Sequence, residues 1–126
     1  MGLPRAIEAH KRGDLAEAMR HYQRAFDQGD DRQPLFQNYG ALLRQDGRND
    51  KALEVYERGI LCNPNDIGVL TNRANLIRED KPASALADLA KALRLRIAQG
   101  DKPQDWNDLL RSLISLCGEL GLRAWQ

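Results

Sequence analysis

The sequence predicts an all-α fold built from antiparallel helix pairs, and three observations support this prediction. The sequence matches itself when it is shifted by 34 residues. Apolar residues recur at helical spacing, and no alternation of apolar and polar residues is long enough for a strand. Within 14–28, for example, one apolar stripe comprises Leu15, Ala18, Met19, Tyr22, Ala25 and Phe26.

The internal repeat is carried by small and aromatic residues at fixed places. The third copy is one residue shorter than the second, and we expect the missing residue in the loop near Lys81 and Pro82, where no packed side chain is lost. The matched pairs are Ala18 with Ala52, Tyr22 with Tyr56, Ala6 with Gly40, Gly40 with Ala74, and Ala52 with Ala85. Small side chains at Gly40 and Ala74 are expected to face Ala52 and Ala85, so that paired helices approach closely.

The periodicity and the turn residues together predict seven helices. We expect them at about 4–12, 15–28, 34–46, 50–62, 67–79, 82–98 and 103–119, with the sixth running on by an extra turn. The expected N-cap residues are Asp14, Asn49 and Asp66, and the expected loop glycines are Gly13, Gly29, Gly47 and Gly100.

Two helices in each 34 residues, with residues 62–66 (CNPND) as the turn that closes the second copy, resemble the tetratricopeptide repeat. The resemblance implies a right-handed superhelical solenoid of antiparallel helix pairs within a single domain, 1–126. Its repeats would span about 1–32, 33–66 and 67–99, with a terminal or capping helix at 103–120. The third copy departs from the motif at Arg73, which stands at the place of Tyr39, and the last helix departs from it at Leu110, which stands at the place of a small residue.

Composition narrows the function class. The 126 residues are 42% hydrophobic and 29% charged, which argues against disorder, and a net charge of +1 gives no case for nucleic acid or an anionic membrane. The chain contains no apolar run of transmembrane length and no apolar core of a signal peptide. We therefore expect a single domain in the cytoplasm.

The residues that could carry chemistry do not form a recognisable site. His10 and His21 are 11 positions apart, and Cys62 and Cys117 are 55 apart, so neither pair has metal-ligand spacing. The cysteines are expected to be small core hydrophobes. The sequence contains no phosphate loop and no nucleophile elbow. We expect no enzyme activity, no metal and no cofactor.

Binding of a partner peptide or helix is the favoured function. In tetratricopeptide arrays the first helix of each pair lines a concave groove, and the resemblance places polar residues there. Asn38 recurs as Asn72, and an amide can hydrogen-bond an extended peptide backbone whatever its side chains. Arg44 recurs as Arg78; these could bind carboxylates or phosphates, or could be helix-end cations favoured by the helix dipole. The full candidate set is Lys11, Gln37, Asn38, Arg44, Thr71, Asn72, Asn75 and Arg78.

Two alternatives remain open from the sequence. The asparagine pair resembles the ladder in the arrays of O-linked N-acetylglucosamine transferases, so the chain could be the N-terminal, substrate-presenting region of a larger enzyme. The last helix has a broad apolar face, and Trp106, Leu110 and Ile114 could instead mediate self-association. The carboxylate clamp of chaperone-binding members does not carry over, because Leu3 and Ile7 stand where it needs Lys and Asn.

Overall fold

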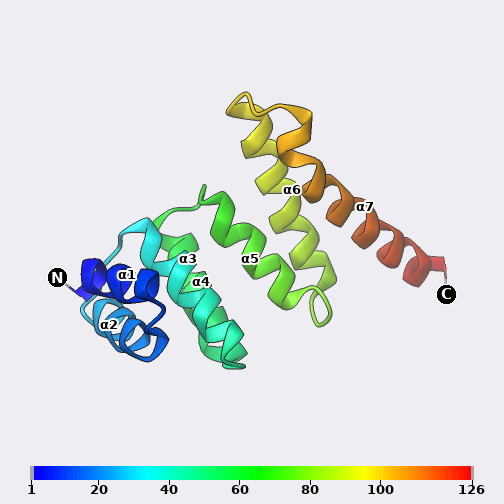
Figure 1. Cartoon of the computed structure of the whole chain (residues 1–126). Helices are drawn as coiled ribbons and strands as arrows, with labels where there is room; N and C mark the ends of the chain where they lie inside the picture. The colour runs from blue at the N-terminus through cyan, green and yellow to red at the C-terminus, as the bar shows by residue number, and fades with distance from the viewer. Residues whose placement is uncertain (1, 126) are drawn as a thin grey trace. The chain divides into compact units, whose positions relative to one another are not determined.

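The computed structural model describes residues 2–125, with side chains described through residue 121. The described residues contain helices and no strand, so the predicted all-α class is confirmed (Figure 1). The helices are α1 (Gly2–Arg12), α2 (Leu15–Asp27), α3 (Gln33–Gln45), α4 (Asn49–Cys62), α5 (Ile67–Ile77), α6 (Pro82–Ala98) and α7 (Pro103–Trp125).

The predicted helix boundaries hold to within about two residues through α6. The longer α6, with 17 residues against 13 in α2 and 14 in α4, confirms the extra turn expected in the third copy. The prediction for the last helix was too short, since α7 continues to Trp125. All four predicted loop glycines have positive φ, between 78° and 83°, which a residue without Cβ adopts at no steric cost.

Two of the three predicted N-caps are confirmed. The Asp14 carboxylate accepts a hydrogen bond from the Glu17 amide at 3.1 Å, and the Asp66 carboxylate accepts one from the Val69 amide at 3.2 Å. The prediction for Asn49 was wrong. Asn49 is the first residue of α4, and the N-cap position falls on Arg48, whose side chain makes no capping hydrogen bond.

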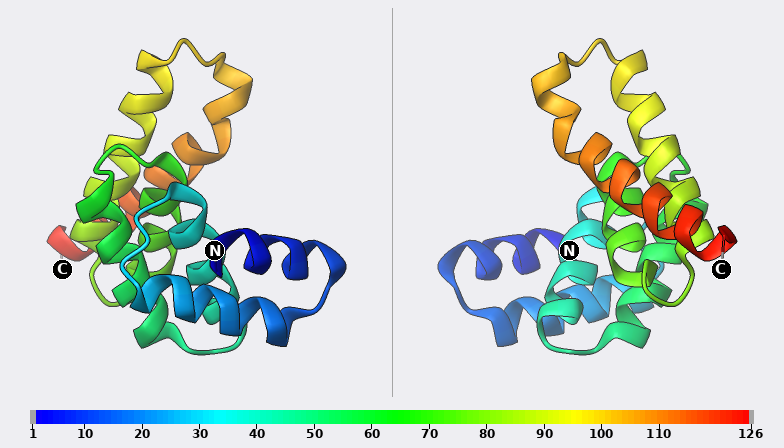
Figure 2. Two further views of the ribbon diagram at one scale, coloured as in Figure 1. Left: turned by 90° about the vertical axis from the view of Figure 1, so that its left-hand side faces the viewer. Right: turned by 90° about the vertical axis from the view of Figure 1, so that its right-hand side faces the viewer.

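The chain divides into two compact units, unit 1 (Met1–Pro64) and unit 2 (Asn65–Gln126). In unit 1, α1 packs against α2, α2 also packs against α3, and α3 packs against α4. In unit 2, α6 packs against both α5 and α7. Within unit 1, α1 and α2 are joined by a short turn and run antiparallel, as the side views show (Figure 2).

An aromatic cluster forms the core of unit 1. The rings of Tyr22 and Tyr39 stack with centroids 6.0 Å apart, and Phe26 meets Tyr39 edge-on at 5.9 Å. The Arg58 guanidinium lies 3.6 Å from the centroid of Phe26 and donates a hydrogen bond to the Phe26 carbonyl at 2.9 Å. This contact joins α4 to α2, so it ties the two helix pairs of unit 1 together.

Gly40 is required by a close approach of an aromatic ring. A Cβ at this position would overlap Cε1 of Tyr56, whose side chain is fully buried. The sequence predicted that Gly40 faces Ala52. Ala52 is indeed buried, but the atoms nearest to the missing Cβ all belong to Tyr56. The small residue therefore makes room for a ring rather than for a second small side chain.

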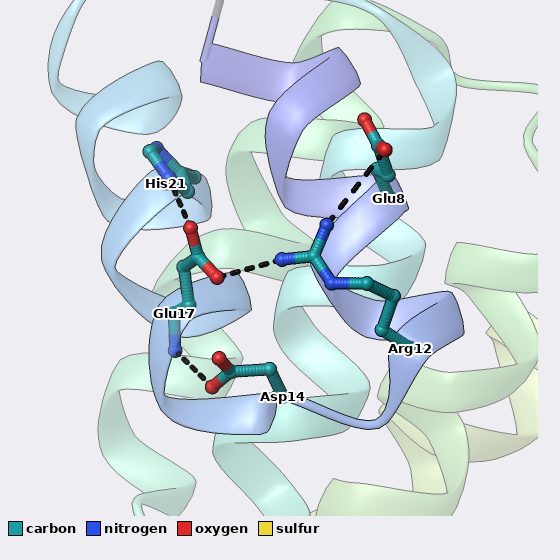
Figure 3. A network of polar contacts seen from close by, with 5 residues as sticks. All are labelled: Glu8, Arg12, Asp14, Glu17 and His21. Carbon is teal, nitrogen blue, oxygen red and sulfur yellow. Dashed lines mark hydrogen bonds and ion pairs between the residues drawn. The ribbon is translucent and has the colours of Figure 1, made fainter.

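A polar network secures the corner between α1 and α2 (Figure 3). The Arg12 guanidinium lies 2.8 Å from the Glu17 carboxylate and 3.7 Å from Glu8. Glu17 also lies 3.6 Å from Nε2 of His21, while its backbone amide is capped by Asp14. These partly exposed groups link the end of α1 to the first turns of α2.

The last helix buries only one side of its apolar face. Leu109 and Leu116 are buried, whereas the Ile114 side chain is 63% exposed. The expectation that the cysteines are core residues was wrong, because Cys62 and Cys117 are both free and exposed. Cys117 follows Leu116, which takes the buried position, and Cys62 is the last residue of α4.

Candidate peptide-binding surfaces

The first helices of the pairs carry a pocket in unit 1. It has a volume of about 440 Å³ and lies between α1 and the start of α3. Its lining on α1 combines apolar residues with charged ones, and Lys11 is the predicted site residue among them. The lining comprises Leu3, Pro4, Ile7, Glu8, Lys11, Arg32 and Pro34.

Some charged residues of this pocket form ion pairs with other described residues, and Lys11 does not. Arg32 lies 2.5 Å from the Asp30 carboxylate, and this hydrogen bond holds the pKa of Asp30 below its usual value. Glu8 lies 3.7 Å from Arg12. Lys11 is exposed and forms no ion pair with a residue that the structure describes. The pocket therefore combines an apolar wall with an available ammonium group.

Asn38 takes part in a buried contact inside unit 1. Burial raises the pKa of Tyr22, and a hydrogen bond from the Asn38 side chain to the Tyr22 hydroxyl opposes part of that rise. The same hydroxyl lies 3.1 Å from Nδ1 of His10. An amide has two N–H donors and a carbonyl acceptor, so Asn38 retains hydrogen-bonding capacity for a ligand. The other predicted residues of α3, Gln37 and Arg44, are exposed and lie outside the pocket lining.

Unit 2 has its own pocket, of about 230 Å³, formed by α5, α6 and α7. The structure brings two predicted residues together here, Thr71 and Asn75. The Thr71 hydroxyl donates to the Ile67 carbonyl at 2.8 Å. The lining comprises Thr71, Asn75, Arg96, Asp105, Asp108, Leu109 and Ser112.

The remaining predicted residues of α5 and its cap lie outside this lining. Asn72 is half-buried. The guanidinium of Arg78, the residue that caps α5, lies 3.7 Å from the Glu119 carboxylate of α7. Arg78 lies at the C-terminal end of α5, where the helix dipole favours a cation. The neighbouring Glu119 carboxylate shows that an acidic group can approach its guanidinium.

The predicted self-association residues differ in exposure. Trp106 is half-buried, and its indole N–H donates to the Asp101 carbonyl at 3.2 Å. Leu110 is half-buried, whereas Ile114 is exposed. Trp106 therefore has a structural role within unit 2, and Ile114 is the most accessible of the three.

Sequence reasoning missed the acidic wall of the unit 2 pocket, although a signal was present. Aligning Trp106 with Phe36 places Asp108 at the position of Asn38 and Asn72, so one more step of the repeat would have found it. Arg96 gave no such signal. It lies on a second helix, and its position at the pocket depends on how α6 packs between α5 and α7.

The described residues contain neither a metal-binding cluster nor a membrane-spanning helix. No group of three or more His, Cys, Asp or Glu side chains within this range could hold a metal ion. In the same part of the chain, no helix combines the length and the apolar character needed to cross a membrane.

Antiparallel helix pairs with pockets along their first helices define a helical-repeat protein. The chain belongs to the tetratricopeptide repeat family, which matches residues 9–75, more than half of its length. This membership confirms the resemblance inferred from the sequence.

Solved structures share the fold at low sequence identity. One is the first tetratricopeptide-repeat domain of Spaghetti (RPAP3) bound to the HSP90 peptide SRMEEVD; it is 16% identical, with a TM-score of 0.75 over 95% of this chain and 90% of that chain. Another is the MamA protein, 14% identical, with a TM-score of 0.76 over 95% of this chain and 62% of that chain. No curated protein sequence matches this chain significantly.

Proposed function

We propose that this chain is a non-catalytic protein-interaction module that binds a peptide segment of a partner on the first helices of its repeats. The observation that carries the proposal is the position of two of the pockets in the described residues. One involves α1 and the start of α3 in unit 1, the other involves α5 and α7 in unit 2, and three predicted contact residues line them, namely Lys11, Thr71 and Asn75.

The available groups suit recognition of an extended chain. Asn38, Asn72 and Asn75 can each present an amide to a peptide backbone, which needs both donors and acceptors. Arg44 and Arg78 add cations that favour acidic groups of the partner. A peptide-bound structure of similar fold, the Spaghetti domain, supports this class of ligand.

Selection from a displayed library of random peptides on the immobilised full chain tests the proposal. We expect enriched peptides to bind the chain in solution, and Arg44→Glu with Arg78→Glu to weaken binding about tenfold and to reduce its salt dependence. The matched control is Arg24→Glu with Arg94→Glu, which makes the same charge change at exposed positions on second helices. Circular dichroism checks that helicity is retained. Failure to enrich any binding peptide would reject the proposed function.

Self-association is a second candidate, favoured by the exposure of Ile114. The Ile114 side chain is 63% exposed, and a Cβ at Gly118 or Gly121 of α7 would meet nothing within 4 Å, so a second helix could approach closely. We expect Ile114→Glu to lower the mass measured by light scattering towards that of a monomer. A monomer already in the parent protein would exclude this candidate.

A further inference from the structure

The pocket of unit 2 has a chemistry different from that of unit 1. Its volume of about 230 Å³ is below the range of about 300–1,000 Å³ typical of sites for whole small molecules. A space of this size suits one side chain of a longer ligand. Because its lining is largely polar, the groups that lack partners within the protein indicate which side chain would fit.

Arg96 is the one basic residue among the described residues of the lining, and its charge is already paired. Its Nη1 lies 3.2 Å from the Asp101 carboxylate, so the positive charge already has a counter-ion. Its Nε is buried and has no hydrogen-bond partner among the described residues. A buried Nε cannot be reached by a ligand, so Arg96 contributes to the pocket a guanidinium whose charge is already paired.

The α7 wall supplies acceptors that need donors. Asp105 uses one carboxylate oxygen, Oδ2, to accept from the Lys102 amide, which leaves the other oxygen available. Asp108 is fully exposed, and its ion pair with Arg111 spans 3.7 Å between exposed side chains, so it is strongly screened. The pocket lining therefore has a net negative charge, because it holds the two carboxylates and one guanidinium whose charge is already paired.

Neutral groups complete the lining. The side chains of Asn75 and Ser112 hydrogen-bond none of the described residues, so the amide and the hydroxyl can each serve a ligand. An anionic side chain would meet Asp105 and Asp108 and is disfavoured. An apolar side chain would leave the polar groups unpaired.

We propose that this pocket binds a lysine or arginine side chain of the partner peptide. The basic group lies against Asp105 and Asp108, and the Asn75 amide and the Ser112 hydroxyl are available to the peptide backbone. This inference rests on the proposed function, because it specifies one residue of the peptide that the first helices bind. It also requires a basic residue in the partner peptide. Arg44 and Arg78 do not impose this requirement, since those cations favour acidic peptide groups.

Blocked tripeptides test the pocket separately from the longer ligand. The probes are acetyl-Gly-Arg-Gly-amide and its lysine, norleucine and glutamate counterparts, titrated into the isotopically labelled full chain. We expect the arginine and lysine probes to shift the NMR signals of the Asn75 side-chain amide, and the norleucine and glutamate probes to leave them unchanged.

Isosteric variants identify the responsible carboxylates. Asp105→Asn with Asp108→Asn should weaken binding of the arginine probe about tenfold or more, as expected for loss of charge-assisted hydrogen bonds. Glu79→Gln with Asp80→Asn is the matched control, because it removes two exposed carboxylates of unit 2 outside the pocket and should leave the affinity unchanged.

The outcomes separate this inference from the proposed function. Equal binding of the norleucine probe, unchanged affinity in the Asp105/Asp108 variant, or no shift with any probe would overturn the inference. Library peptides that bind the chain without a basic residue would then leave the proposed function standing. Loss of library binding together with a positive arginine probe would reject the proposed function alone.

Discussion

Arg73 and Asp88 form a bidentate ion pair inside unit 2. The guanidinium Nε lies 2.7 Å from one carboxylate oxygen and Nη2 lies 2.6 Å from the other, and the Asp88 side chain is only 7% exposed. In the repeat register these positions correspond to Tyr39 and Val55, both buried in unit 1. The third copy thus has an ion pair at two positions that are buried tyrosine and valine in the second copy, and Asp88 accounts for the arginine that departs from the repeat motif.

Removing one partner of this pair should be strongly destabilising. We expect Arg73→Met to lower the free energy of unfolding by about 3 kcal/mol, because Asp88 is left as a buried, uncompensated charge. The double variant Arg73→Tyr with Asp88→Val copies the second repeat and should recover most of the loss. Urea unfolding monitors both. Arg111→Met, which breaks an exposed pair, is the control and should change stability by less than about 0.5 kcal/mol. An equally small effect of Arg73→Met would contradict the prediction.

The ring of Tyr56 over Gly40 predicts a sharp cost for a single added methyl group. Gly40→Ala should destabilise the protein by about 1–3 kcal/mol, because a buried ring must move. Adding Tyr56→Leu restores space and copies the third repeat, where Ala74 and Leu89 occupy these positions, so it should recover part of the loss. Gly118→Ala is the control. Its Cβ meets nothing, and it should be neutral or stabilising by up to about 1 kcal/mol through helix propensity. Equal thermal stabilities of the two alanine variants would refute this explanation.

Two predicted N-caps can be compared directly, because the structure confirms Asp14 as a cap and does not confirm Asn49. Asp14→Ala removes the acceptor for the Glu17 amide and should cost about 1 kcal/mol. Asn49→Ala removes a residue that caps nothing and should cost less than about 0.5 kcal/mol. Chemical denaturation of the two variants side by side measures the difference. A larger loss for Asn49→Ala would show that the assigned start of α4 is wrong.

Buried tyrosines should make the fold sensitive to alkali. Burial raises the pKa of both Tyr22 and Tyr39 above the ordinary value of 10.0. The folded state then keeps protons that the unfolded chain loses, so the stabilising contribution is complete below pH 10.0 and is lost as pH rises through the raised values. Unfolding free energy measured against pH should fall, with each tyrosine contributing up to about 1.4 kcal/mol per pH unit.

Tyr22→Phe checks the source of this slope. The variant should lose about 1 kcal/mol at neutral pH, because the hydroxyl contacts with Asn38 and His10 disappear. Its alkaline slope should be shallower than that of the parent, since one ionising group has been removed. A parent protein whose stability does not change above pH 10.0 would contradict the burial of these hydroxyls.

The candidate contact residues remain a prediction, and the sequence and the structure bear on them in different ways. Helical spacing fixes which side of a helix a residue occupies, and Lys11, Thr71 and Asn75 line pockets. Spacing does not show what a polar group already bonds. Asn38 was predicted to bind a ligand, and in the structure its side chain also interacts with Tyr22. Arg78 was predicted to bind an acidic group, and in the structure it lies beside Glu119.

By itself the sequence determined the class of fold, the number of helices and nearly all of their ends, because these depend on local spacing, turn residues and a recurring stride. The tertiary structure alone decided how closely the Tyr56 ring approaches Gly40, and that Arg96 reaches the pocket of unit 2. Such relationships join helices that are distant in sequence, and they depend on packing distances of a few ångströms that no single helix specifies.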